Sequence, residues 1–98
     1  MVFARSIDMD LELLQYEKQM RALGNYRRLV IIQRLKQTER MCVLTVADEL
    51  GVSFQTASKH LGRLFQVGIL VRKQVRNEMH YKLSPEIPAS TRSVIDCL

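Results

Sequence analysis

Residues 45–68, TVADELGVSFQTASKHLGRLFQVG, decide the fold, because they read as a helix, a tight turn and a second helix. The first helix is expected to end at Gly51, since glycine takes the left-handed conformation of a helix end at little cost. Ser53 is then placed to cap the second helix through its hydroxyl group. That second helix is predicted to run over residues 54–66.

The second helix has two contrasting faces. At 100° per residue its apolar side chains gather on one side, namely Phe54, Ala57, Leu61, Leu64 and Phe65. The other side carries two bases, no acid and several short hydrogen-bonding side chains, a combination that suits a phosphate-lined groove. Five residues are therefore predicted to face the major groove of double-stranded DNA: Gln55, Thr56, Ser58, Lys59 and Arg63.

Positive charge is concentrated in the same part of the chain. Residues 53–83 hold six bases against one acid, a balance of +5 that equals the net charge of the whole 98-residue chain. Such a segment attracts polyanions whatever their sequence. A solvated basic surface is the ordinary explanation, but its coincidence with a helix-turn-helix pattern favours nucleic acid.

A β-hairpin is expected directly after the second helix, because the apolar period changes there from 3.6 to 2. Its candidate strands are residues 69–74 and 78–83, and Asn77 in the connection can adopt a positive φ. A hairpin in this position is a wing. Arg76 at its tip, with Lys73 nearby, is expected to reach the minor groove or the adjacent DNA backbone.

The remaining segments complete a single domain. Ahead of the helix-turn-helix we expect a frayed segment, two helices and a short strand, over residues 1–7, 9–23, 26–37 and 41–43. Asp8 or Asp10 can cap the first helix, and Asn25 the second. A last helix is predicted over residues 89–98. The expected fold is mainly α, a winged helix-turn-helix of about five helices plus a two-stranded wing over residues 69–83, in one domain spanning residues 1–98.

The first and last helices are predicted to join two chains in a homodimer. Their apolar residues form a stripe in residues 9–23 (Leu13, Tyr16, Met20 and Leu23) and a group in residues 89–98 (Val94, Ile95 and Leu98). An intramolecular core is the plain alternative, and we expect a mixture of both. A chain this short gains stability from an interface, since small domains bury a modest fraction of their surface.

Composition excludes several classes of protein. The chain has no apolar run long enough to span a membrane and no signal peptide, so no membrane partner is expected. Its two cysteines make no disulfide framework, which favours a reducing cytoplasm. It has no Gly-rich phosphate loop and no plausible pairing of nucleophile and base. We therefore expect neither an enzyme nor a bound cofactor.

The chain resembles the ArsR/SmtB family of winged-helix repressors, over roughly residues 10–98. Three segments carry the resemblance: LGNYRRLVIIQRL (23–35), CVLTVADELGVSFQTASKHLGRLFQVGIL (42–70) and MHYKL (79–83). Within them Leu50-Gly51, Ser53, Thr56, Ser58, His60 and Leu61 match the family pattern in order. The resemblance implies a homodimer that occupies an inverted repeat and represses transcription until an effector releases it.

The effector sites of that family do not transfer to this sequence. One site needs clustered thiolates, and here Cys42 is followed by Leu44 where the second thiol should stand. The other needs histidines along the last helix, and residues 84–98 contain none. His60, in the second helix of the motif, is interpreted as a packed, hydrogen-bonded side chain. The sequence thus predicts no metal site and no release by zinc, cadmium or arsenite.

Two questions stay open at the level of sequence. We interpret Cys42 as a small buried hydrophobic residue and Cys97 as an incidental thiol near the chain end. The functional alternative is that the two cysteines form a thiol switch. The domain as a whole is expected to be a sequence-specific DNA-binding regulator. The alternative is a winged-helix module that binds protein or RNA without operator specificity, since fold does not fix function.

Overall fold

The computed structural model describes residues 10–98, which form five helices and a three-stranded antiparallel sheet. In chain order the elements are α1 (Leu11–Leu23), α2 (Tyr26–Gln37), β1 (Met41–Cys42), α3 (Val43–Leu50), α4 (Phe54–Gln66), β2 (Leu70–Val75), β3 (Glu78–Leu83) and α5 (Ala89–Asp96). The expected frayed segment 1–7, with Asp8 as a cap and residue 9 as a helix start, lies outside the described residues. The predicted winged helix-turn-helix is confirmed.

Local capping explains where the helices begin. The Asp10 carboxylate accepts the backbone N–H groups of Glu12 and Leu13, at 3.0 and 3.1 Å, and so starts α1. Asn25 does the same for α2 through the N–H of Arg28. Ser53 accepts the N–H of Thr56 at the start of α4. These three side chains were predictable as caps, because short polar groups satisfy the donors that a helix start leaves free.

Several element boundaries differ from the sequence prediction, among them the end of β2 at Val75 rather than residue 74 and the end of α5 at Asp96 rather than residue 98. α3 begins at Val43 rather than at residue 45, because Val43 is buried in the core as the first helical residue and only residues 41–42 form the strand. β2 begins at Leu70, because the N–H of Ile69 still bonds to the carbonyl of Leu64 at the end of α4. Both residues lie where one element passes directly into the next.

The sheet has the strand order β1-β3-β2, so the wing gains a third strand beyond the two predicted. β1 contributes only Met41 and Cys42, which pair with Tyr81 and His80 of β3. This pairing joins the segment before α3 to the middle of β3. It joins residues about 40 apart in the chain, and a two-residue strand carries too little pattern to reveal it.

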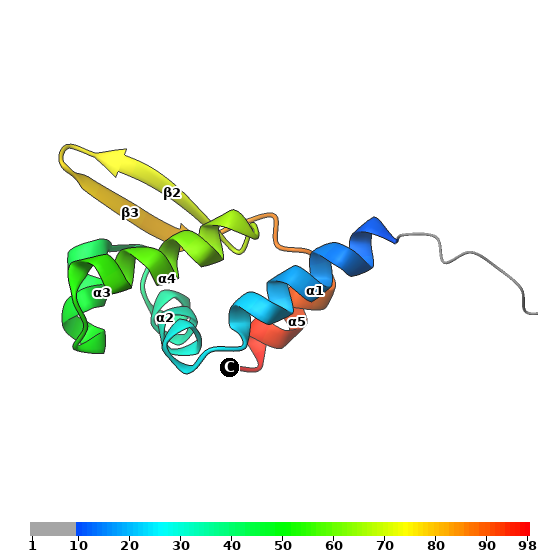
Figure 1. The fold of residues 1–98 in the computed structure, drawn as a ribbon. Coiled ribbons are helices and arrows are strands. Elements are labelled where there is room, and N and C mark those ends of the chain that lie inside the picture. The colour runs from blue at the N-terminus through cyan, green and yellow to red at the C-terminus, as the bar shows by residue number, and fades with distance from the viewer. Residues whose placement is uncertain (1–9) are drawn as a thin grey trace, which may run out of the picture.

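The core lies between the helices and the inner face of the sheet. Side chains from α1, α2, α4 and α5 meet there with 0 % exposure, among them Ala22, Ile32, Leu61 and Ile95. Figure 1 shows α1 and α5 side by side at one end, the hairpin extending from the other, and α4 between them. None of the helices within residues 10–98 is long and apolar enough to cross a membrane.

Candidate nucleic-acid interface

The two faces predicted for α4 are present, with one exception. Ala57, Leu61 and Leu64 are each 0 % exposed, whereas Gln55, Lys59 and Arg63 are exposed on the other side. Thr56 and Ser58 are half-buried at the margins. The expectation that Phe54 belongs to the buried face is wrong, because its side chain is 55 % exposed. It is the first residue of the helix, and it lines an open hollow beside the start of α3 and the hairpin.

The N-terminal end of α4 is held by local contacts. The Ser53 hydroxyl accepts the Thr56 N–H at 3.1 Å and lies 3.0 Å from the Thr56 hydroxyl oxygen, to which it can donate. Thr56 retains its own hydroxyl proton for a further acceptor. No ion pair of the described residues involves Lys59 or Arg63, so both cations are available to a phosphate.

The C-terminal end of α4 is anchored by α1 and α5. The carbonyl of Val67 accepts the side-chain amides of Gln15 and Gln19, both at 2.9 Å. Gln19 is 1 % exposed, and its amide oxygen accepts the hydroxyl of Thr91, which is 0 % exposed. Sequence reasoning missed this network, because it searched α1 for an apolar stripe. The one available signal was two glutamines four residues apart, which share a helix face.

His60 is packed against α2. The Arg28 guanidinium lies 3.2 Å from His60 Nδ1 and also donates to the carbonyl of Ala22. Since a guanidinium only donates, Nδ1 accepts and the ring proton resides on Nε2. Burial, and then the charges of Arg28 and Arg27, lower the pKa of His60. Burial and the nearby Arg63 lower the pKa of Arg28 in turn. A neutral, hydrogen-bonded His60 agrees with the interpretation drawn from sequence.

The lowered pKa of His60 makes stability depend on pH. The unfolded chain, with a pKa near 6.5, takes up the proton before the folded chain does. Protonation of His60 in the unfolded chain should therefore lower the free energy of unfolding as the pH falls through that value. We expect this free energy to decrease more between pH 7 and pH 5 in the native chain than in the His60→Asn variant. Denaturant unfolding at both pH values measures this. An equal or smaller decrease in the native chain would contradict it.

The wing is attached to α4 by an arginine. The Arg72 guanidinium lies over the ring of Phe65 at 4.0 Å from its centroid, and it donates to the Tyr81 hydroxyl at 3.4 Å. This contact places the hairpin next to the exposed face of α4. Since alternate residues of a strand point to opposite faces, Lys73 lies on the outer face of the sheet, away from Phe65.

Arg76, and not Asn77, has the positive φ expected in the hairpin turn. Its φ is 57°, and it is the only non-glycine residue with positive φ among residues 10–98. Val75 pairs with Glu78, so the turn has two residues, and such turns need the left-handed conformation at their first position. The sequence assigned the conformation by residue preference, whereas the register of the two strands decides it. The basic side chain therefore stands at the first position of the turn.

Arg76→Gly separates the conformational role of this position from its charge. The left-handed conformation costs an ordinary residue roughly 1 kcal/mol, so the variant should unfold at an equal or higher denaturant concentration. The variant should also lose one phosphate contact. The slope of the logarithm of the DNA-binding constant against the logarithm of salt concentration should therefore become shallower by about one. Asn77→Gly is the control. It keeps the positive charge of Arg76, and it removes no conformational cost because Asn77 does not have a positive φ. If Arg76→Gly were the less stable of the two, this assignment would be wrong.

The cysteines and acids of residues 10–98 form no metal centre. No group of three or more histidine, cysteine or acidic side chains in residues 10–98 is placed to hold a metal ion. Cys42 is half-buried at the start of α3, with its Sγ 3.3 Å from the Thr45 hydroxyl. Cys97 is exposed just after α5. Both side chains are free thiols.

Comparison with known proteins identifies the fold and its relatives. No protein-family model matches the chain. The arsenical resistance operon repressor of Escherichia coli (strain K12) is 34% identical over 74 residues, which cover 76% of this chain and 63% of the repressor. The chain thus spans less than two thirds of that relative.

Solved structures extend the match over nearly the whole chain. A homodimeric winged helix-turn-helix DNA-binding domain from Mycobacterium bovis, a possible ArsR-family transcriptional regulator, has a TM-score of 0.77 and 26% identity. That match covers 97% of this chain and 85% of the other. HlyU from Vibrio cholerae has the same fold, with a TM-score of 0.76, 22% identity and coverage of 91% and 92%. The chain is thus similar, in sequence and in fold, to ArsR-type winged helix-turn-helix proteins.

Proposed function

We propose that this protein is a sequence-specific DNA-binding regulator of transcription, a repressor without enzymatic activity. One observation carries the proposal. The exposed face of α4 presents bases and hydrogen-bonding side chains with no acid, and a cationic hairpin tip stands beside it. The repressor function of the Escherichia coli relative and the DNA-binding domain from Mycobacterium bovis support it.

In this proposal α4 enters the major groove. Gln55, Lys59 and Arg63 supply the central contacts, because they are exposed and lie on one side of the helix. A glutamine can read adenine through two hydrogen bonds, and lysine or arginine can read guanine. Thr56 and Ser58 supply shorter contacts from the margins of the same face.

The wing adds backbone contacts. Arg76 at the turn contributes a phosphate or minor-groove contact. We expect Lys73 to contribute less to DNA affinity than Arg76. Lys73 lies on the outer face of the sheet, so its side chain reaches the duplex only around the edge of the hairpin. Flexible lysine side chains bind phosphate without strict geometry.

We further propose a homodimer formed through α1 and α5; the related DNA-binding domain from Mycobacterium bovis is itself homodimeric. Leu11 and Leu13 support it, because they are 73 % and 62 % exposed and would lose that exposure at an interface. Leu23 and Ile95, expected to contribute, are 4 % and 0 % exposed within one chain and so belong to its core. In a two-fold dimer the two copies of α4, the recognition helix of each chain, should lie about 34 Å apart, which is one turn of DNA.

If the protein is a dimer, light scattering at micromolar concentration should give twice the mass of one chain, which is 11.4 kDa. Leu13→Glu should reduce that mass to one chain, since it places a charge in an apolar interface. Leu44→Glu is the matched control, because Leu44 is similarly exposed, at 56 %, but lies on α3. A native chain that is monomeric, or a Leu44→Glu variant that dissociates as readily, would contradict the assignment.

Selection of bound sequences from random duplex DNA tests the function as a whole. We expect an inverted repeat, with a binding constant that falls steeply with salt. Repeating the selection with metals and with a mild oxidant examines the effector: we expect no release by zinc, cadmium or arsenite, and if there is a chemical switch we expect it to be oxidation at Cys42 or Cys97. Binding to duplexes without sequence preference would favour a protein- or RNA-interaction module instead.

A further inference from the structure

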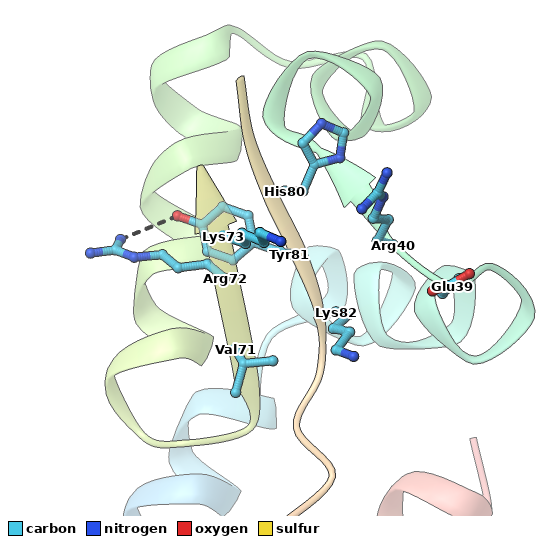
Figure 2. Close-up of a pocket in the computed structure, with 8 residues that line it drawn as sticks. All are labelled: Glu39, Arg40, Val71, Arg72, Lys73, His80, Tyr81 and Lys82. Atoms are coloured by element: carbon cyan, nitrogen blue, oxygen red, sulfur yellow. Dashed lines mark hydrogen bonds between the residues drawn. The ribbon is translucent and has the colours of Figure 1, made fainter. Parts of the chain in front are cut away.

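The outer face of the sheet carries a hollow, and of its lining the DNA-binding proposal uses only Lys73. It has a volume of about 290 Å³ and is lined by Glu39, Arg40, Val71, Arg72, Lys73, His80, Tyr81 and Lys82. Figure 2 shows these side chains around β2, β3 and the segment that leads into β1. The volume lies at the small end of the range found for ligand sites in proteins.

Four cations line the hollow; the Arg72 guanidinium contacts Phe65 and Tyr81, and the other three cations come from three neighbouring segments. Lys73 lies on β2 and pairs with His80 of β3, and Lys82 is two residues further along β3. Arg40 directly precedes Met41, which pairs with Tyr81, so the register places Arg40 beside Lys82. Cations at such positions are cross-strand neighbours, and like charges placed this way repel one another.

The cations are not neutralised by the protein. Of the ion pairs among residues 10–98, none involves Arg40, Lys73 or Lys82. Glu39 is the only acid in the lining. The other nearby carboxylate, Glu78, lies 3.4 Å from the imidazole of His80. The hollow therefore holds an excess of positive charge in a concave site, which suits an anion bearing more than one negative charge.

The hollow faces away from the recognition helix. Arg72 contacts Phe65 of α4 on the inner face of the sheet, and the alternation of a strand puts Lys73, His80 and Lys82 on the opposite face. A straight duplex bound to the exposed face of α4 therefore does not fill the hollow. A small ligand fits this position better than the same DNA does.

We propose that this hollow is a binding site for a small phosphate-bearing anion, of the size and charge of a pyrophosphate group. Arg40 supplies the planar fork that matches two phosphate oxygens. Lys73 and Lys82 supply the flanking charges. This anion site does not depend on the proposed binding of DNA by α4, because all the residues that line it belong to one chain.

Inorganic pyrophosphate added to the free native protein tests the site. Calorimetry should give one site per chain, and backbone amide NMR should show saturable shifts confined to residues 39–41, 71–73 and 80–82. Arg40→Gln and Lys82→Gln should each weaken binding roughly 5- to 10-fold, as expected for the loss of one close charge in solvent. Lys18→Gln, with the same charge change on the exposed side of α1, should leave it unchanged. Acetate, a monoanion, should give no saturable shift.

Any one of four results would overturn the site. Shifts that spread equally over α4, or an equal loss in Lys18→Gln, would mean general screening by counterions. Absence of saturation would mean that no site exists. Protection of the same amides by a selected duplex, in place of pyrophosphate, would assign the hollow to flanking DNA. Circular dichroism checks that each variant is folded, and Lys82→Arg should bind as the native chain does, which separates lost charge from altered packing.

Discussion

Lys59→Ala should weaken binding to a selected operator duplex by about 1–3 kcal/mol, which is roughly a 5- to 150-fold loss. Lys59 is exposed near the middle of the polar face of α4, where a groove-bound helix makes its central contacts. The substitution removes a charge-assisted hydrogen bond and leaves the apolar face of the helix unchanged. Fluorescence anisotropy at several salt concentrations measures the loss.

Controls separate a base contact from general charge. Lys36→Ala makes the same charge change on α2, where the lysine bonds the carbonyls of Asp96 and Leu98, and should have little effect on DNA affinity. Gln55→Ala should relax the preference at one base position while leaving the salt dependence unchanged, because an uncharged side chain releases no counterion. The docking model fails if Lys59→Ala and Gln55→Ala both bind the selected duplex as tightly as the native chain.

Gln19→Leu should lower the free energy of unfolding by about 1–3 kcal/mol. Gln19 is one of the most buried polar side chains of the chain, and it connects Val67 after α4 with Thr91 of α5. The substitution leaves the buried hydroxyl of Thr91 without its partner. Val67 keeps one hydrogen bond, from Gln15. Denaturant unfolding of the variant measures the loss.

A double-mutant cycle makes this prediction specific to the network. Thr91→Val alone should also destabilise, because it leaves the Gln19 amide oxygen unpaired. Together the two substitutions should cost less than the sum of the single ones, since the second removes the group that the first left unsatisfied. Gln15→Leu, at an exposed position on the same carbonyl, should cost less than either. Strict additivity of Gln19→Leu and Thr91→Val would contradict the network.

Much of this fold could be predicted because its signals are local. The bounds of α4, its cap at Ser53 and the positive φ of Gly51, 66°, follow from residues next to one another in the chain. The features that sequence missed depend on distant partners. A short strand was expected at β1 but its pairing with β3 was not, and Gln19 is buried because it bonds to Thr91 and to the carbonyl of Val67 after α4. A polar side chain gives no sign of such partners.

The same limit applies to the candidate interface. Bases and short polar side chains on α4 were predictable from periodicity, and their exposure agrees with that pattern. Phe54 was misplaced because a helical wheel gives the direction of a side chain and not how far its neighbours extend. The positive φ of the hairpin turn was attributed to Asn77 instead of Arg76, because strand register decides which turn residue adopts it. The hollow on the outer sheet face gathers residues from three segments, which no single stretch of sequence displays.

The unequal attachment of the two ends of α4 has a mechanical consequence. Side chains of α1 hold its C-terminal end, whereas the hydrogen bonds of Ser53 at its N-terminal end are local. The helix has 13 residues and is therefore about 20 Å long. A tilt of about 5° about the C-terminal end displaces the N-terminal end, together with the α3 helix that packs on it, by about 1.7 Å. Hydrogen bonds to bases are lost over such a distance. A small rearrangement of α1 against α5 would thus act as a lever on DNA affinity, with no change in the side chains that read the DNA.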